Sequence, residues 1–427
     1  MNWLSPFLIM FLASLGTALA MTPVARRIAI RLDAVDYPNA RRINKVPIPR
    51  MGGIAVFLGI VVAAAIMRYC GPLLGWPVIL VRHLDANLDY RLIAVGFLIM
   101  FVTGAIDDVV QLKPLAKLCG QILAAAVACS GGLVIGSIVN PLGGEVILGW
   151  LAYPVTIFYL VAFANIINLI DGLDGLATGI GCIASATLFV LSYQAGHLDA
   201  AALAVALAGS TAGFLPYNFH PASIFLGDCG SLLIGFALGT ISVLNVTRLA
   251  GLTTIIVPLV VAGIPIIDTL SAIIRRRRAH VSVGHADRGH IHHRLIAEGF
   301  DQRQAVLLIY AWTLLLCAGA VVLTQVTLWP RIAIFVVLVV CSAGFASRLH
   351  LFEPVLRHHM DPATGEDELV TPDDPAFKVE EERAEQEREE HIEHLREMLP
   401  GERHHEAEGH ASEGHEGEGG PGSGPER

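Results

Sequence analysis

The sequence has little charge. Only 16% of its 427 residues are Asp, Glu, Lys or Arg, whereas 54% are hydrophobic. Soluble globular domains carry about 25% charged residues, so this composition excludes an ordinary soluble protein and is typical of a polytopic membrane protein. We therefore expect a protein that works within a membrane and has no nucleic-acid partner.

Two further absences narrow the class. The seven cysteines are scattered and form no C-x-x-C pair, so we interpret them as small apolar fillers rather than a disulfide or zinc framework. A signal peptide begins with a positively charged region. No Lys or Arg precedes the first apolar run of this chain, so that region is missing. Residues 1–25 are therefore expected to stay in place as a membrane span.

Long apolar runs dominate what is present. Eleven of them come close to the ~20 residues that a helix needs to cross a bilayer. They cover residues 3–25, 51–69, 91–106, 115–135, 146–168, 175–194, 198–216, 230–247, 251–274, 304–326 and 330–347. The predicted fold class is an all-α polytopic integral membrane protein with about eleven transmembrane helices and cytoplasmic active-site loops.

The composition divides the chain into two parts. We expect residues 1–350 to form the transmembrane domain. Residues 351–427 form an acidic tail rich in His, Glu and Gly, expected to be helical over residues 377–399 and disordered from residue 400 on. Its histidines could bind a transition metal, although a hydrophilic tail is the simpler interpretation.

Lys and Arg gather in alternate loops. The loops after the first, third and ninth apolar runs are rich in them, whereas the loops between are poor. Because cytoplasmic loops carry the excess of Lys and Arg in membrane proteins, this parity predicts that the N-terminus lies outside and the tail inside.

Asn168, Asp171 and Asp174 lie where the fifth apolar run ends. An aspartate at the end of a membrane helix is costly unless it serves a function. The spacing of three places these side chains on one face if the helix continues that far. Three oxygen-bearing groups together suit a hard cation such as Mg2+ and the phosphates that it carries. The alternative is a polar helix cap in a loop.

Three more polar clusters follow odd-numbered runs. They are Asp107 with Asp108, Asn218 with Asp228, and His290 with His292 and His293. All four clusters fall on the predicted cytoplasmic side, which favours a single site assembled from several loops. Adjacent residues point about 100° apart on a helix, so we expect Asp107 and Asp108 to do different jobs.

The residue types in these clusters suit phosphoryl transfer, which depends on positioning and on neutralising phosphate charge. Lys113 and Lys117 are four residues apart and could face phosphate from one side of a helix. Histidines beside arginines indicate anion binding or proton transfer near neutral pH.

Together these residues resemble the polyprenyl-phosphate N-acetylhexosamine-1-phosphate transferases, and they look most like the WecA/TagO branch of that family. The related MraY branch, which acts on UDP-MurNAc-pentapeptide, shares the core. The matching stretches are VDYPNAR (35–41), KVPIPRMGG (45–53), DD (107–108), NLIDGLDG (168–175), FLGD (225–228) and HIHH (290–293). Each motif alone is weak, but the set is specific.

The resemblance implies an Mg2+-dependent enzyme, for which Mn2+ is a second candidate metal. It would transfer N-acetylglucosamine-1-phosphate from UDP-N-acetylglucosamine to an undecaprenyl-type polyprenyl phosphate, release UMP and start a cell-envelope polysaccharide. The implied partners are the UDP-N-acetylhexosamine donor, the polyprenyl phosphate lipid and the membrane, and a homodimer is a further candidate.

The resemblance also implies roles for single residues. The implied metal ligands are Asp228, Asn168 and Asp171, and the implied catalytic residues are Asp107, Asp108 and His292. The implied substrate-binding residues are Lys45, Asp174, Asn218, Phe225, His290 and His293, and the charge of Lys117 and Arg278 adds these two as phosphate-binding candidates. The implied localisation is the inner membrane of a bacterium.

Three other functions compete with this one. Within the same chemistry, the donor could be UDP-MurNAc-pentapeptide, as in the MraY branch. A secondary transporter would also carry ionisable residues in its spans, but near the bilayer midplane and often with inverted repeats. A scaffold working through its acidic tail would leave the loop clusters unexplained.

Overall fold

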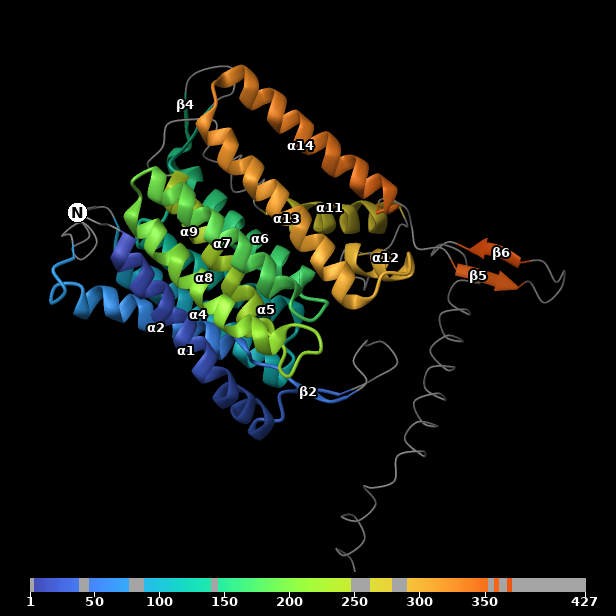
Figure 1. Ribbon diagram of the computed structural model, residues 1–427, viewed down its shortest axis with the longest axis horizontal. Helices are drawn as coiled ribbons and strands as arrows, with labels where there is room; N and C mark the ends of the chain where they lie inside the picture. The colour runs from blue at the N-terminus through green and yellow to red at the C-terminus, as the bar shows by residue number, and fades with distance from the viewer. Residues whose placement is uncertain are drawn as a thin grey trace, which may run out of the picture.

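In the computed structural model, the chain forms a helical bundle with three short antiparallel strand pairs within the described part (Figure 1). The structure describes residues 4–37, 46–76, 88–139, 145–246, 262–278, 290–351, 357–360 and 367–370. The helices are α1 (Leu4–Arg31), α2 (Gly53–Ala65) with a π-helical end (Ile66–Cys70), α4 (Tyr90–Val110), α5 (Pro114–Ser130), α6 (Ala152–Ile170), α7 (Leu176–Gln194), α8 (Leu198–Asn218), α9 (Asp228–Val246), α11 (Gly263–Arg278), α12 (Ile291–Ala297), α13 (Gln302–Gln325) and α14 (Leu328–Arg348). The strands are β1 (Val35–Asp36), β2 (Ile48–Pro49), β3 (Ser137–Val139), β4 (Glu145–Ile147), β5 (Arg357–Met360) and β6 (Asp367–Val370).

The predicted fold class is confirmed. Among the described residues, nine helices are long and apolar enough to cross a bilayer, and α5 is a shorter apolar helix of 17 residues. The expected ninth span lies partly outside the described residues, and its described part belongs to α11. The count of eleven therefore stays a prediction, as do the tail helix over 377–399 and the disorder from 400 on, which lie outside the described residues.

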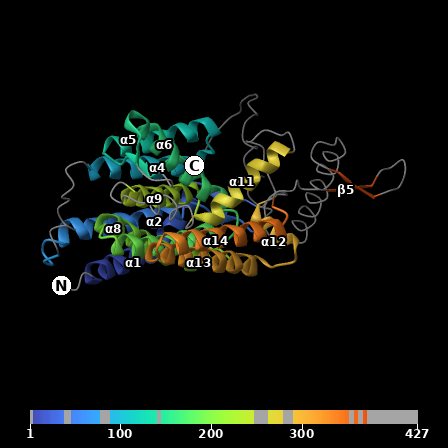
Figure 2. The ribbon, with the colours of Figure 1, turned by 90° about the horizontal axis from the view of Figure 1, so that it is seen from above.

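Helix α9 is the centre of the bundle. Its side chains from Cys229 to Asn245 are buried on every face, as expected for a helix that is apolar all round. Helices α2, α4, α6, α7 and α8 all pack against it, and Figure 2 shows it lying between α4 and the pair α2 and α8. The residue at its first turn is thus held from several sides.

Glycine allows α4 to approach the start of α9 closely. A Cβ on Gly104 would lie 2.5 Å from the backbone oxygen of Asp228, which no real side chain could tolerate. Small residues at helix contacts let membrane helices pack backbone to backbone. This contact places the last turn of α4, with its two aspartates, directly beside the N-terminus of α9.

The predicted polar clusters meet at one end of the bundle, as expected because each of them follows an odd-numbered apolar run. Helices α4, α6 and α8 end there, and α5, α9 and α12 begin there (Figure 1). The β1–β2 pair joins this end, with Val35 opposite Pro49. The backbone of Phe225 is tied to the same pair, because its N–H donates to the carbonyl of Pro49 at 2.8 Å.

Candidate active site

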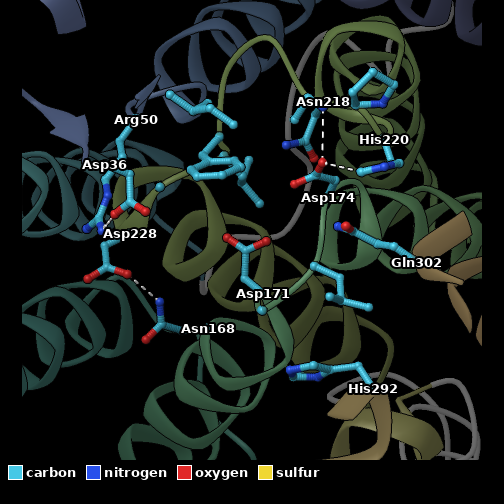
Figure 3. A pocket seen from close by; sticks show the side chains of 18 of the residues that line it. Asp36, Arg50, Asn168, Asp171, Asp174, Asn218, His220, Asp228, His292 and Gln302 are labelled. Atoms are coloured by element: carbon cyan, nitrogen blue, oxygen red, sulfur yellow. Dashed lines mark hydrogen bonds and ion pairs between the residues drawn. The ribbon is translucent and has the colours of Figure 1, made fainter. Parts of the chain in front are cut away.

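A cavity of about 740 Å³ opens at this end of the bundle (Figure 3). Its walls come from the last turn of α4, the turn between α6 and α7, the segment between α8 and α9, the β1–β2 pair, and the first turns of α12 and α13. Segments more than 250 residues apart in the sequence, such as Asp36 and Gln302, therefore share one cavity. The volume falls in the range typical of small-molecule sites, about 300–1,000 Å³.

Asp228 is bound tightly by two neighbours. The ammonium group of Lys117, from α5, lies 2.5 Å from its Oδ2, and the amide of Asn168, from α6, donates to its Oδ1 at 2.6 Å. Lys117 also contacts Asp107 at 2.9 Å and Asn168 Oδ1 at 3.3 Å. All three ammonium donors of Lys117 are thus used, so it bridges α4, α6 and α9.

The two adjacent aspartates of α4 diverge, as predicted. Asp107 faces Lys117, and its other oxygen accepts the N–H of Leu112 at 2.7 Å. Asp108 accepts the backbone N–H groups of Asp228 and Cys229 at 2.8 and 3.0 Å. Asp108 therefore caps the N-terminus of α9, while Asp107 holds Lys117.

Gly227 makes the cap of α9 possible. Its φ of +74° lies in the left-handed region, which glycine adopts without a steric penalty. A Cβ at this position would also fall 2.6 Å from a carboxylate oxygen of Asp108. The glycine in the FLGD motif is therefore required by the geometry that delivers Asp228.

Asn168, Asp171 and Asp174 were expected to share one helical face only if the helix continued that far, and it does not. Helix α6 ends at Ile170, so the two aspartates lie in a turn and point to different places. Asn168 binds Asp228 and Ser231, while Asp174 turns toward the segment after α8. The glycines at 172 and 175, which weaken helix propensity, account for the early end of the helix.

Asp171 lies near the middle of the cavity (Figure 3). Within the described part of the chain, its carboxylate makes no hydrogen bond or ion pair. Burial, followed by the carboxylates of Asp228, Asp108 and Asp174, raises the pKa of Asp171 well above its usual range. The guanidinium group of Arg50 opposes this shift. The cavity thus contains negative charge that its described walls do not balance.

Asp174 and Asn218, the candidates for the nucleotide side of the site, stabilise the segment between α8 and α9. Asp174 Oδ2 accepts the N–H of Ala222 at 3.0 Å and lies 2.8 Å from His220 Nδ1. Asn218 accepts the hydroxyl of Thr178 at 2.6 Å and donates to the carbonyl of Ile224 at 3.1 Å. Both side chains therefore shape the segment that presents Phe225, whose half-buried ring lines the cavity.

The three histidines separate. His292 and His293 line the cavity, whereas His290 lies against Asp268 of α11, with 2.8 Å between Nδ1 and the carboxylate. His292 is only 3% exposed, and burial lowers its pKa to about 3. It is therefore neutral at pH 7, not a cation. Its Nδ1 is buried without a hydrogen-bond partner among the described residues.

Two substrate-binding predictions cannot be placed. Lys45 lies outside the described residues, and for Arg278 only the backbone at the end of α11 is described. Lys113 is exposed at the N-cap of α5, one turn from Lys117. Of the four arginines that end α11, Arg275 is buried and donates to the carbonyl of Leu351, so it does not face a substrate.

Four cavity or support residues were not singled out from the sequence. Arg50 forms an ion pair with Asp36 at the cavity wall, and His220 and Gln302 also line it. Arg50 lies within the stretch 45–53 that carries the resemblance, whereas nothing in the local sequence distinguishes His220 or Gln302. Asp268 did carry a signal, because it is a lone acid within an apolar run, and such a residue is a functional hypothesis by default.

The donor set partly fits a hard divalent cation. Among the described residues, no three His, Cys, Asp or Glu side chains converge as a ready metal cluster. The cavity nevertheless offers Asp171, Asp228 and the amide of Asn168, and oxygen ligands of this kind suit Mg2+. The unbalanced carboxylates around Asp171 are the observation that favours a cation there.

Comparison with known proteins gives one consistent result. Residues 90–246 match the family model "Glycosyl transferase family 4". The chain is 38% identical over 331 residues to a probable undecaprenyl-phosphate N-acetylglucosaminyl 1-phosphate transferase of Bacillus subtilis, covering 77% of this chain and 88% of that protein. It is 37% identical over 321 residues to a decaprenyl-phosphate N-acetylglucosaminephosphotransferase of Mycolicibacterium smegmatis, covering 69% and 76%.

A relative that matches a shorter part of the chain is named for a different sugar group, N-acetylmuramoyl-pentapeptide. The phospho-N-acetylmuramoyl-pentapeptide-transferase of Shouchella clausii is 33% identical over 231 residues, covering 53% of this chain and 68% of that protein. The matched family region runs from the start of α4 to the end of α9, which includes Asp107, Asp108, Asn168, Asp171 and Asp228. The chain is a polytopic membrane protein that belongs to glycosyl transferase family 4.

Proposed function

We propose that the protein transfers N-acetylglucosamine-1-phosphate from UDP-N-acetylglucosamine to an undecaprenyl-type polyprenyl phosphate. UMP is released, and the product starts a cell-envelope polysaccharide. The printed names of the relatives support this reaction. The observation that carries it is the cavity shared by Asp228, which Lys117 bridges, and by Asp171, which has no partner among the described residues. Such a site suits two phosphates that meet with a cation between them.

The reaction exchanges one phosphorus–oxygen bond for another. An oxygen of the lipid phosphate attacks the β-phosphorus of the donor, and the bond between that phosphorus and the oxygen bridging to the α-phosphate breaks, so that UMP leaves. A phosphate monoester has a second pKa of about 6, so its nucleophilic oxygen is largely ionised at pH 7. No strong base is needed, which agrees with Asp107 having both oxygens occupied.

The residues on the α4, α6 and α9 side of the cavity would position the metal. Asp107 holds Lys117, Asp108 holds the start of α9, and together they fix Asp228. Asp171, Asp228 and Asn168 would hold Mg2+, and Mn2+ accepts similar oxygen ligands. When bound, the metal supplies positive charge that offsets the repulsion between the two phosphates.

The opposite wall suits the nucleotide and the sugar. The ring of Phe225 offers a flat face for the uracil base, in a segment ordered by Asp174 and Asn218. His292 and His293 face the same cavity from α12 and would bind the sugar diphosphate. Because His292 is neutral, it acts there as a hydrogen-bonding group.

The secondary-transporter alternative is not supported by this arrangement. The carboxylates gather at one end of the bundle, at the ends of α4 and α6 and the start of α9. Transporters instead place coupling residues near the bilayer midplane.

A donor panel tests the function. Detergent-solubilised protein with polyprenyl phosphate and Mg2+ is offered UDP-N-acetylglucosamine, UDP-N-acetylgalactosamine or UDP-MurNAc-pentapeptide, and UMP release is measured. We expect UDP-N-acetylglucosamine to be used faster than the pentapeptide donor by on the order of 10-fold or more, because a peptide stem would extend beyond a cavity of this size.

Two outcomes would change the proposal. Faster turnover with UDP-MurNAc-pentapeptide would assign the chain to the pentapeptide-transferase reaction and leave the chemistry unchanged. No UMP from any donor, in protein that is monodisperse in detergent, would overturn the transferase proposal itself.

We also propose that the protein lies in the bacterial inner membrane with the cavity facing the cytoplasm. A green fluorescent protein fused after residue 350 should then fluoresce, and alkaline phosphatase inserted near Gly143 should be active outside. The physical reason is the excess of Lys and Arg in the loops on the cavity side. A tail fusion that reports an external location would reverse the orientation.

A further inference from the structure

Asp268 is a buried acid outside the cavity wall. It lies in α11 and is 1% exposed. One carboxylate oxygen accepts the backbone N–H of Ile291 at 2.8 Å, and the other lies 2.8 Å from Nδ1 of His290. Burying a carboxylate costs free energy unless its oxygens are paired. Both of these partners belong to the start of α12, and none of the three residues lines the cavity.

The two bonds fix where α12 begins. His290 is the N-cap residue of α12, and its own side chain makes no capping bond. The carboxylate of Asp268, which belongs to α11, provides the missing cap by accepting the first N–H of α12. A carboxylate beside Nδ1 also selects the tautomer in which Nδ1 carries the proton. The position and the tautomer of His290 are thus both set by α11.

The other side of α12 rests on the turn after α6. A Cβ on Gly172 would lie 2.6 Å from Cε1 and Nε2 of His292, so the imidazole ring packs directly on the glycine beside Asp171. The rings of His290 and His292 are parallel within 2°, with centroids 5.8 Å apart. A displacement at His290 would therefore be passed to His292 in the cavity wall.

Helix α11 is anchored elsewhere, so it can serve as a fixed support. Arg275, two turns after Asp268, is 3% exposed and donates to the carbonyl of Leu351, just beyond α14. It also donates to the hydroxyl of Ser271 at 3.1 Å. The two buried charged residues of α11 thus bind two different segments. Asp268 binds the start of α12, and Arg275 binds the chain just after α14.

We propose that Asp268 is a positioning residue for the donor site. It holds the start of α12 so that His292 and His293 stay in the cavity wall, and it does not touch the substrate. This inference rests on the proposed function, in which that wall binds the sugar diphosphate. Loss of the carboxylate should therefore weaken use of the donor while leaving use of the lipid acceptor intact.

Asp268→Asn tests the proposal, with Thr269→Val as the matched control on the same helix. The asparagine keeps the size of the side chain and can still accept the Ile291 N–H, but its NH2 group meets the Nδ1–H of His290. Because loss of a partner that orients a histidine typically costs about 10–100-fold, we expect the donor KM to rise about tenfold and the KM for polyprenyl phosphate to stay within about twofold. Thr269→Val should change neither KM, since its hydroxyl has no hydrogen-bond partner in the described structure.

A second variant covers the case in which Asp268→Asn does not fold. Ile291→Pro removes the backbone N–H that Asp268 accepts, and proline suits the first position of a helix. The residue before it is already extended, with ψ of 152° at His290, as proline requires. We expect the same selective rise in donor KM, but a smaller one, because the bond to His290 remains. Because the side chain of Ile291 is only 2% exposed, Ile291→Val is the control that shortens this side chain and keeps the N–H.

The outcomes separate this inference from the proposed function. Unchanged donor KM in both variants, or equal changes in both KM values, would overturn the positioning role while wild-type turnover still supports the transferase. If wild-type protein uses a different donor in the panel, the same comparison is made with that donor. A selective rise in its KM then supports the positioning role, and no rise overturns it.

Discussion

Asp228→Asn is expected to reduce UMP release by on the order of 1,000-fold, the upper range for the loss of one preorganised electrostatic group. The carboxylate accepts from Lys117 and from Asn168 at once. An amide keeps the size but presents NH2 to one of these two donors, so one contact becomes repulsive. The negative charge proposed to hold Mg2+ is lost as well. The measurement is kcat from UMP release with UDP-N-acetylglucosamine over a series of Mg2+ concentrations.

A matched control lies at the opposite end of the bundle. Asp199, in the first turn of α8, accepts the hydroxyl of Tyr90 at 2.5 Å, and an amide oxygen can accept that hydroxyl equally well. Asp199→Asn should therefore leave kcat and the Mg2+ dependence unchanged. Wild-type turnover in Asp228→Asn, with unchanged Mg2+ dependence, would move the proposed metal site away from α9.

Lys117→Met should lower turnover by on the order of 100-fold. The methionine keeps most of the length of the side chain but removes the ammonium group shared by Asp107, Asp228 and Asn168. Two carboxylates would then face each other without a cation, and one of them would take up a proton or turn away. Either change displaces Asp228 from its present orientation. Single-turnover UMP release at saturating substrates measures the effect on the chemical step.

Lys113→Met is the control for this variant. It makes the same substitution four residues earlier, at an exposed N-cap position. We expect turnover within about twofold of wild type, since surface substitutions rarely perturb a structure by more than about 0.5 kcal/mol. Equal losses in both variants would instead support the sequence-based expectation that the two lysines form one phosphate-binding face.

The sequence predicts the bundle and the end at which the site forms, because both follow from local physics. Apolar runs set the helices, and the alternation of cationic loops puts Asp107, Asn168, Asp228 and His292 at one end. The helix ends were less predictable. Helix α1 continues to Arg31, six residues beyond the end of its apolar run, because a helix can extend out of the bilayer with charged residues on it.

What each polar side chain binds could not be predicted, because its partner depends on the tertiary packing. Asp174 lines the cavity, as expected of a substrate-binding residue, but its contact with His220, 46 residues away, could not be foreseen. His290 was expected to bind an anion and instead meets an acid of α11. The sequence also left open whether His292 is neutral or charged, and its burial in the folded protein favours the neutral imidazole.

The cap that Asp108 places on α9 has an electrostatic consequence for the whole cavity. The N-terminus of a long helix carries the equivalent of about half a positive charge and commonly binds phosphate directly. Here the first two N–H groups of α9 already serve a carboxylate, and the next acid along the wall, Asp228, is paired with Lys117. The partial positive charge at the start of α9 is therefore neutralised by the carboxylate of Asp108. The start of α9 thus offers a phosphate little attraction of its own, which agrees with the proposal that a bound cation supplies the positive charge at this wall.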